Sequence, residues 1–353
     1  MKPDRSLKEA FGSALASAAA AAAVIVALAV ATLGLSACGG GKEKTAKSAE
    51  RPFHVGLVFD VGGLGDKSFN DSAYQGLIRA RDELGITFEY FEPSQSSDRE
   101  AALRLYSQAE TDLIVGVGFL FTDDVNAVAR DFPDRRYVCI DYSWSEGQAV
   151  PPNVVGLKFR EEEGAFLVGA LAAMVGETSV YGFVGGMDIP LIHKFEAGYR
   201  AGILYIRPDA RVLVNYAGVT GDAFKNPAKG KELALAQYEQ GAAAIFHASG
   251  STGLGVFEAA REQNHLAIGV DADQSAEAPG LVLTSMVKRV DRALFDEIAQ
   301  AKAGKFEGGI RSFGLKEGGV DYVRSAFVTP ERAARLDEIA ARISSGEIRI
   351  PVE

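Results

Sequence analysis

The sequence predicts an α/β protein made of two successive doubly wound lobes, each with a parallel β-sheet that has helices on both faces. Short β-rich runs alternate with longer amphipathic runs along most of the chain, which is typical of parallel sheets. This alternation begins again near residue 158 and gives a second unit of similar size. At 353 residues the chain is long enough for each unit to bury its own core. We therefore expect two lobes with a cleft between them.

The first 52 residues precede the predicted fold. Three basic residues within the first eight are followed by an uncharged, Ala-rich stretch over residues 11–37, which ends in Leu35-Ser36-Ala37-Cys38. Small residues before a Cys at this point form the lipobox of bacterial lipoproteins, in which signal peptidase cleaves before the Cys and its thiol carries diacylglycerol. We expect a lipoprotein signal peptide over residues 1–37, a lipidated Cys38 and a polar tether over residues 38–52.

The alternative to cleavage is an uncleaved transmembrane helix, because the apolar stretch is long enough to span a bilayer. Either arrangement places the body of the protein in the cell envelope, facing the periplasm or the exterior. Once Cys38 is acylated, Cys139 is the only thiol of that body. It lies in the apolar run RYVCID, so we expect a buried structural cysteine and no disulfide.

The first lobe has strand patterns with helical patterns between them. The strand patterns are rich in β-branched and aromatic residues and cover residues 54–60, 87–93, 112–118, 136–142 and 153–159. Apolar residues at helical spacing follow the first three strands, over residues 69–85, 97–110 and 121–133. Each strand is thus followed by a helix or by the next strand, as a doubly wound sheet requires.

The second lobe repeats this order. Its helical patterns cover residues 161–176, 195–208, 227–241 and 253–264, and its strand patterns cover residues 179–188, 211–218, 242–250 and 266–273. A sparser tail follows, with segments over residues 281–287, 290–304, 311–323 and 330–346. This tail is too short for a third domain. We expect it to complete both lobes, so that the chain crosses between them several times.

Charge and motifs exclude several classes of function. The formal net charge is -10 and no clustered basic face can be found, which argues against a nucleic-acid partner. The loops GSTGLG and VGGLGDKS lack the spacing of a P-loop or a dinucleotide fingerprint. No catalytic motif surrounds the four His residues, of which His247 beside Ser249 is the best candidate, and Asp271 with Asp273 does not complete a calcium loop. We therefore expect no cofactor, no metal and no catalysis.

Polar and aromatic residues at the carboxyl ends of the predicted strands indicate ligand binding instead, because open α/β sheets bind ligands beyond those ends. Residues at such ends are Asp60, Phe119, Asp141, Gly186, Asp188, His247 and Asp271. Helix capping explains part of the polar cluster from Asp66 to Asp71, where Asp66 and Ser68 suit the start of a helix. Capping does not require Phe69, nor Phe224 in the second lobe. An exposed aromatic ring on each lobe would sandwich a flat ligand.

Several longer motifs occur in a family-specific order. They are GDKSFND, FVGGMDIPLIHKFEAGYRAG, NPAKGKE, GSTGLGVFEAARE, GVDADQ, LTSMVKRVD and GLKEGGV. In this order they resemble the basic membrane protein family of purine nucleoside receptor A-like lipoproteins, and the resemblance covers residues 53–345. The resemblance implies a type I periplasmic-binding-protein fold, in which three hinge crossings join the two lobes.

The resemblance also implies where the lobes meet. We expect the crossings near residues 155–160, 282–287 and 308–315. The lobes would then comprise residues 53–157 with 285–310, and residues 158–284 with 311–353.

The function implied by the resemblance is that of a substrate-binding lipoprotein of an ABC importer, typically for a purine nucleoside. Ligand binding would close the cleft by a hinge motion, and the closed form would dock on the membrane permease. The expected partners are therefore a small-molecule ligand, the permease and the membrane that holds the lipid on Cys38. The protein itself is expected to be a monomer.

Base recognition can be carried over motif by motif. Phe69 of GDKSFND would stack on one face of the base, and Phe224, which precedes NPAKGKE, would stack on the other. Asp60 and Asp141 would accept hydrogen bonds from the edge of the base, with Asn70 nearby. The chain reads GGLGD where many relatives have an acidic segment, so these edge contacts depart most from the family pattern.

Ribose recognition carries over in the same way. Asp271 of GVDADQ would accept hydrogen bonds from the ribose hydroxyls, since a carboxylate makes charge-assisted bonds to a vicinal diol. Lys316 of GLKEGGV would be the cationic partner of this ribose site. Gly186 and Gly250 would let the backbone approach the ligand closely.

Two other functions remain compatible with parts of the sequence. A sensory receptor that passes its signal to a membrane kinase would have the same kind of binding lobes. A nucleoside hydrolase would need a run of aspartates near its N-terminus to hold calcium and activate water, and VFDVGGLGD does not supply one.

Overall fold

The structure is a computed structural model, and it describes residues 51–352. The predicted signal peptide, Cys38 and nearly all of the predicted tether lie outside the described residues. Within residues 51–352, no helix combines the length and the apolar character needed to cross a bilayer.

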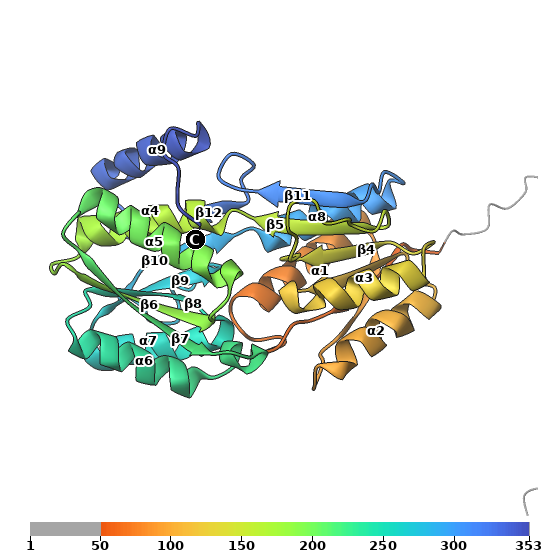
Figure 1. Ribbon diagram of the computed structural model, residues 1–353, viewed down its shortest axis with the longest axis horizontal. Coiled ribbons are helices and arrows are strands. Elements are labelled where there is room, and N and C mark those ends of the chain that lie inside the picture. Colours follow the sequence, from red (N-terminus) through yellow and green to blue (C-terminus); the bar gives the residue numbers. More distant parts are fainter. Residues whose placement is uncertain (1–50, 353) are drawn as a thin grey trace, which may run out of the picture. The chain divides into compact units, whose positions relative to one another are not determined.

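The described chain forms two six-stranded sheets with the same layout. The first sheet has the order β11-β5-β4-β3-β1-β2 and the second has the order β12-β10-β9-β8-β6-β7. All neighbouring strands are parallel except β12, which runs antiparallel to β10. The chain changes sheet after β5, after β10 and after β11. The predictions of two doubly wound α/β lobes and of three crossings are therefore confirmed (Figure 1).

The strands are short and mostly buried on both faces, as strands of covered parallel sheets are. The first sheet contains β1 (His54–Val58), β2 (Thr87–Phe91), β3 (Leu113–Val117), β4 (Tyr137–Ile140), β5 (Val154–Phe159) and β11 (Gly309–Phe313). The second contains β6 (Val180–Met187), β7 (Arg211–Gly218), β8 (Ala244–Ala248), β9 (Leu266–Asp271), β10 (Val282–Lys288) and β12 (Val320–Tyr322).

Helices cover both faces of each sheet (Figure 1). The helices of the first lobe are α1 (Phe69–Leu84), α2 (Ser97–Gln108), α3 (Thr122–Asp131) and α8 (Val290–Lys302). Those of the second are α4 (Glu161–Val175), α5 (Pro190–Ile206), α6 (Pro227–Glu239), α7 (Gly253–Gln263) and α9 (Pro330–Ser344). Single 3-10 turns follow two central strands and β7, as η1 (Phe119–Phe121), η3 (Gly250–Thr252) and η2 (Gly221–Phe224). Helix α1 packs on α8, α2 on α3, α4 on α5 and α6 on α7, and α9 also packs on α4.

The changes of sheet fall a few residues later than the expected lobe boundaries. Strand β5 keeps residues 158–159 in the first sheet, β10 keeps residues 285–288 in the second, and β11 keeps residues 311–313 in the first. The physical reason is that the strand pattern runs through each predicted boundary without a break. Which sheet a strand joins depends on its hydrogen-bonded neighbours, and these are remote in sequence.

Ion pairs connect the crossing segments. Arg160, just after β5, pairs with Glu163 at 2.5 Å and with Glu317, which lies in the turn between β11 and β12. The backbone N–H of Leu315 in the same turn donates to Glu163 at 2.7 Å. The first and third crossings are thereby held side by side at the junction of the lobes.

Candidate ligand-binding site

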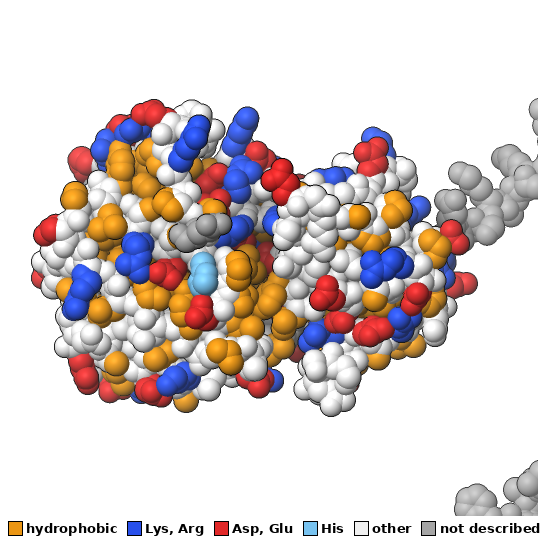
Figure 2. All heavy atoms as spheres, in the orientation of Figure 1, with side chains coloured by type: hydrophobic (Ala, Val, Ile, Leu, Met, Phe, Trp, Pro, Cys, Tyr) orange, Lys and Arg blue, Asp and Glu red, His pale blue; other side chains and the backbone are white. Residues whose placement is uncertain are grey.

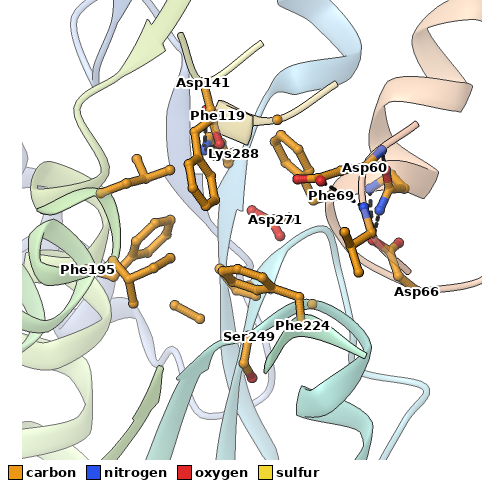
Figure 3. A pocket seen from close by; sticks show the side chains of 18 residues that line it. Asp60, Asp66, Phe69, Phe119, Asp141, Phe195, Phe224, Ser249, Asp271 and Lys288 are labelled. Carbon is orange, nitrogen blue, oxygen red and sulfur yellow. Dashed lines mark hydrogen bonds and ion pairs between the residues drawn. The ribbon is translucent and has the colours of Figure 1, made fainter. Parts of the chain in front are cut away.

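A pocket lies between the two lobes, beyond the carboxyl ends of strands from both sheets. Its lining consists of Asp60, Val61, Asp66, Phe69, Asn70, Gly118, Phe119, Asp141, Leu191, Ile192, Phe195, Phe224, Ala248, Ser249, Gly250, Val270, Asp271 and Lys288. Figure 2 shows a hollow with hydrophobic side chains on its walls, and Figure 3 shows the pocket from close by. This is the place where open α/β sheets bind ligands.

Two aspartates occupy matching positions in the two lobes. Asp141 follows β4 and Asp271 ends β9, and these strands hold the same place in the order of their sheets. Both residues have a left-handed backbone, with φ of 58° at Asp141 and 66° at Asp271. Such a conformation is uncommon for a residue other than glycine, and it gathers at binding and active sites. Both carboxylates are thereby directed into the space between the sheets.

Asp60 is the carboxylate that follows β1. Its Oδ1 accepts the backbone N–H of Val61 at 2.7 Å, and its own N–H donates to Oδ1 of Asn70 at 3.1 Å. A Cβ at Gly118 would overlap the Asp60 carboxylate, so glycine is required there. Burial raises the pKa of Asp60 to about 7, which lets this group act as donor or acceptor near neutral pH.

The start of α1 places Phe69 and Asn70 at the pocket. The Asp66 carboxylate accepts the backbone N–H groups of Ser68 at 2.9 Å, Asn70 at 2.9 Å and Asp71 at 3.1 Å. It therefore satisfies the free N–H groups of the first turn, as a cap does. The Ser68 side chain does not cap the helix, contrary to expectation, and its hydroxyl donates across the cleft to Asp271.

A second contact across the cleft reinforces this one. Nε2 of Gln274 in the second lobe donates to the backbone carbonyl of Lys67 at 3.0 Å, while its Oε1 accepts the N–H of Val270 at 2.8 Å. The same Oε1 lies 3.0 Å from Nε2 of His247. Burial lowers the pKa of His247 to about 4, so this residue is a neutral part of the scaffold and a weak base toward Ser249, whose Oγ is 3.4 Å away.

Phenylalanine rings from both lobes face the pocket. Phe69 and Phe119 belong to the first lobe and Phe224 to the second, and the centroids of Phe119 and Phe224 are 6.3 Å apart with an interplanar angle of 65°. In Figure 3 Phe69 and Phe119 lie on one side of the pocket, and Phe224 lies opposite them. The rings leave faces available to a flat ligand.

Gly186 and Gly250, the two glycines expected to approach the ligand, both lie against Phe224. A Cβ at Gly186 would overlap the Phe224 ring, and Gly186 itself is not part of the pocket lining. Gly250 does line the pocket, and a Cβ there would come within 3.0 Å of the Phe224 carbonyl, at a backbone φ of 55°. Both glycines therefore make room for the loop that carries Phe224.

The cation at the pocket is Lys288, at the end of β10. Its Nζ lies 2.7 Å from the Asp141 carboxylate and 3.0 Å from Glu161, and its side chain is 2% exposed. Burial lowers the pKa of Lys288, but Asp141 and Glu161 outweigh that effect and hold the pKa above its ordinary value. The ammonium also lies 5.1 Å from the centroid of the Phe69 ring, within cation–π range.

Lys316, expected at the ribose site, does not belong to this pocket. It is exposed in the turn between β11 and β12 and is not among the lining residues. The turn leads into β12, whose Val320 pairs with Lys288, but the Lys316 side chain is exposed to solvent. A signal for Lys288 was present in the sequence, since a lone lysine at the end of the apolar strand LVLTSMVK must find a partner when it is buried.

The pocket thus unites seven of the nine residues expected to contact the ligand with other residues that were not among those nine. The predicted residues in the lining are Asp60, Phe69, Asn70, Asp141, Phe224, Gly250 and Asp271. The additions with aromatic or charged groups are Asp66, Phe119, Phe195 and Lys288. Within residues 51–352, no group of three or more His, Cys, Asp and Glu side chains is placed to hold a metal ion. The arrangement suits a flat, neutral molecule that carries several hydrogen-bond donors.

Comparisons with known proteins agree with this geometry. The family described as "ABC transporter substrate-binding protein PnrA-like" matches residues 53–353. An uncharacterized lipoprotein of Pyrococcus abyssi is 38% identical over 304 residues, which is 82% of this chain and 73% of that protein. Basic membrane protein A of Borreliella burgdorferi is 36% identical over 302 residues, which is 84% of this chain and 87% of that protein.

A solved structure gives the same result. An ABC transporter solute-binding protein of Aeropyrum pernix K1 is 32% identical, with a TM-score of 0.77, and the match covers 86% of this chain and 94% of that one. The relatives named above are called a lipoprotein and a membrane protein, which is consistent with a location in the cell envelope. The chain belongs to the Bmp family of PnrA-like ABC transporter substrate-binding proteins, as the resemblance implied.

Proposed function

We propose that this protein binds a nucleoside, with purine nucleosides preferred, and delivers it to the permease of an ABC importer. The observation that carries the proposal is that the rings of Phe69, Phe119 and Phe224, which come from both lobes, line one pocket. The charged groups in the lining of this pocket are carboxylates and one lysine. A nucleoside combines a flat ring with a ribose diol, so it needs both kinds of group.

The base would lie between Phe69 and Phe224. Stacking on an aromatic ring contributes about 0.5–1.5 kcal/mol beyond the burial of area. The edge of the base would meet Asp60, Asp141 and Asn70, which offer acceptors and, at Asn70 and protonated Asp60, donors. Both base faces and one edge would then be covered.

The ribose would meet Asp271 and Lys288. A carboxylate accepts hydrogen bonds from two neighbouring hydroxyls, and an ammonium donates to hydroxyl oxygens. In the structure the Ser68 hydroxyl already donates to Asp271, so ribose hydroxyls would join an existing hydrogen-bonded group. Lys288 takes the role that the resemblance assigned to Lys316.

Binding without catalysis is part of the proposal. His247 is the base candidate nearest the pocket, and its pKa of about 4 and its bond to Gln274 make it a poor proton acceptor. The protein would be attached to the membrane through lipid on Cys38, with its body facing the periplasm or the exterior. It would act as a monomer that delivers its ligand to the permease.

The test is calorimetric titration of the full chain with adenosine, guanosine, inosine, cytidine and free ribose. We expect saturable binding of purine nucleosides, weaker binding of cytidine and no binding of ribose. Phe69→Ala is expected to weaken binding by at least about tenfold, equal to about 1.4 kcal/mol. Phe91→Ala, on the exposed edge strand β2, serves as the matched control and leaves affinity unchanged.

Two outcomes contradict the proposal. If no nucleoside binds while a sugar or a peptide does, the ligand class is wrong. If the nucleoside is converted to free base and ribose during the titration, as chromatography of the mixture would reveal, the protein is an enzyme.

A further inference from the structure

Two further pockets open off the ligand pocket, and each shares an aspartate with it. The Asp271 flank is lined by Lys67, Asp71, Ser72, Gln75, Asp271, Ala272, Asp273, Glu277, Val287, Arg289 and Asp291. The Asp141 flank shares Phe119, Asp141 and Leu191 with the ligand pocket, and it adds Trp144, Lys158 and the start of α5. The two flanks differ in charge.

The Asp271 flank is acidic. Its two cations face five carboxylates, and the guanidinium of Arg289 is bound by Asp291 at 2.9 and 3.0 Å. An anionic group would meet repulsion from Asp271, Asp273 and Glu277 there. This flank therefore excludes anions.

On the Asp141 flank the carboxylates are already neutralised. Asp141 pairs with Lys288 at 2.7 Å, and Glu161 pairs with Lys288 at 3.0 Å and with Lys194 at 2.9 Å. Two lysines and two carboxylates line this flank, and Lys288 adds its charge to both carboxylates from the ligand pocket. Of the two lysines that line this flank, Lys158 is the one that pairs with neither carboxylate.

The ammonium of Lys158 has N–H donors that no residue among 51–352 uses. Its Nζ donates to the carbonyl of Trp144 at 2.8 Å and lies 5.6 Å from the centroid of the Trp144 ring, and it pairs with no carboxylate among residues 51–352. An ammonium has three N–H donors, so two remain. Burial lowers the pKa of Lys158, and Lys194 lowers it further, so a bound anion would relieve both effects.

The start of α5 adds a second favourable feature. Ile189 precedes this 17-residue helix and provides no side-chain cap, and Ile189, Pro190 and Leu191 all line the flank. The first turn of a helix carries partial positive charge, which favours an anion. Pro190 has no N–H, and the N–H groups of Ile192 and His193 donate to the Ile189 carbonyl at 3.0 Å each, so the N–H that this turn can offer is that of Leu191. The hydroxyl-bearing residues Ser143 and Ser145 line the same space.

We propose that the Asp141 flank is a binding site for a small anionic group, a carboxylate or a phosphate, held by Lys158 and the start of α5. The group would be part of the molecule in the ligand pocket or a separate ion that binds beside it. The anion site itself does not depend on the proposed nucleoside function. Only the question of whether the anionic group belongs to the ligand rests on that function.

The chain supplies its own reporter for this site. Trp144 is the only tryptophan of the sequence, and the ammonium of Lys158 lies 5.6 Å from the centroid of its ring. Titration of the full chain with inorganic phosphate at constant ionic strength is therefore expected to change the Trp144 fluorescence along a saturable curve. Chloride at the same ionic strength is expected to give no saturable change.

The variant Lys158→Gln is expected to raise the midpoint of the phosphate titration by at least about tenfold, because the charge that holds the anion is gone. Lys67→Gln is the matched control, since Lys67 on the acidic flank also forms no ion pair with a carboxylate among the described residues. Its midpoint is expected to stay within about twofold of the parent value. Calorimetry with phosphate provides a second reading that does not depend on tryptophan. An unsaturable response in the parent chain by both methods, or equal midpoints for Lys158→Gln and the parent, overturns the proposal.

A competition experiment identifies the source of the anion. If the group belongs to the ligand, a nucleoside 5′-monophosphate binds at least as tightly as the nucleoside, loses affinity in Lys158→Gln and displaces phosphate. If it is a separate ion, nucleoside and phosphate bind together and Lys158→Gln affects phosphate alone. The phosphate titration stands without any nucleoside, so failure of the nucleoside titrations alone contradicts the proposed function and leaves the anion site in place.

Discussion

Lys288 and Asp141 form a buried ion pair between the two lobes, with Nζ 2.7 Å from the carboxylate. Lys288 ends β10 of the second sheet, and Asp141 follows β4 of the first. Glu161, at the start of α4, shares the same ammonium at 3.0 Å. One cation thus connects a pocket residue with the helix that begins right after the first crossing.

Removal of this cation is expected to destabilise the protein. Lys288→Met leaves two carboxylates buried without their partner, and loss of one member of a buried pair costs about 3–5 kcal/mol. Urea unfolding should report this loss in the free energy of unfolding. Lys316→Met, at an exposed position, should change it by less than about 0.5 kcal/mol. Equal effects of the two variants would contradict the roles assigned to these lysines.

The contact between Gly186 and Phe224 makes a prediction about affinity. Gly186→Ala should displace the Phe224 ring, because the new Cβ would overlap it, and ligand binding should weaken by at least about tenfold. In a Phe224→Ala background the same change should have no further effect, since the obstructed ring is gone. Calorimetry on the four proteins closes the cycle. Additive losses would show that Gly186 acts independently of Phe224.

The raised pKa of Asp60 predicts that the free energy of unfolding depends on pH. Its folded pKa of about 7 is raised by burial, and an unfolded Asp titrates near ~3.9. Between these values the folded state binds more protons than the unfolded state, so the contribution of Asp60 to stability falls as the pH rises. The difference in unfolding free energy between the parent and Asp60→Asn should therefore decline by a few kcal/mol over about pH 4 to 7.

Asp271 should behave in the same direction, because burial raises its pKa to about 7 as well. Denaturant titrations of Asp271→Asn and the parent across this range provide the second comparison. A difference that is constant with pH, for both aspartates, would contradict the assignment of buried, protonated carboxyl groups.

The hydroxyl of Ser68 connects the two lobes through its hydrogen bond to Asp271, so its removal should affect closure of the lobes. Its hydrogen bond to Asp271 is lost in Ser68→Ala. A hydrogen bond contributes about 0.5–1.5 kcal/mol when the acceptor is neutral and about 1.5–3 kcal/mol when the acceptor is charged. The equilibrium should shift toward open lobes, which small-angle scattering would detect as a larger radius of gyration. Ser107→Ala is the control, because that buried hydroxyl bonds Leu103 and Tyr137 within the first lobe. Its radius should not change, and an unchanged radius for Ser68→Ala as well would refute the link.

The anchor can be tested in cells. Cys38→Ala removes the thiol that would carry lipid and the residue before which cleavage would occur, so the protein should keep its signal peptide and should not incorporate labelled fatty acid. Cys139→Ala is the matched control and should remain with the membrane, because Cys139 is buried and burial raises the pKa of its thiol. A parent protein that incorporates no labelled fatty acid and keeps residues 1–37 would favour an uncleaved transmembrane helix.

Much of the fold could be read from local patterns. The strands and helices of both lobes leave periodic apolar residues, because each element must bury one or both faces. The residues at which the chain passes from one lobe to the other have no such periodic pattern. Strands β5 and β10 each continue past the expected boundary, so only their pairing with β4 and β9 reveals where the chain changes lobe.

The pocket was accessible to the same reasoning in part. Asp141 and Asp271 end apolar strands, and helix capping does not require aromatic residues at Phe69 and Phe224, so the sequence could single them out. The position of Lys288 at the end of an apolar strand was a signal for it, but both lysines lie in family-like motifs, and the packing shows that Lys288 is the buried one.

The sequence by itself determined the order of elements, the residues at the strand ends and the family. The tertiary structure decided which of those residues meet. Ser68 and Asp271 are 203 positions apart, and Asp141 and Lys288 are 147 positions apart. Such contacts depend on how two separately folded sheets face each other, and local periodicity carries no information about that.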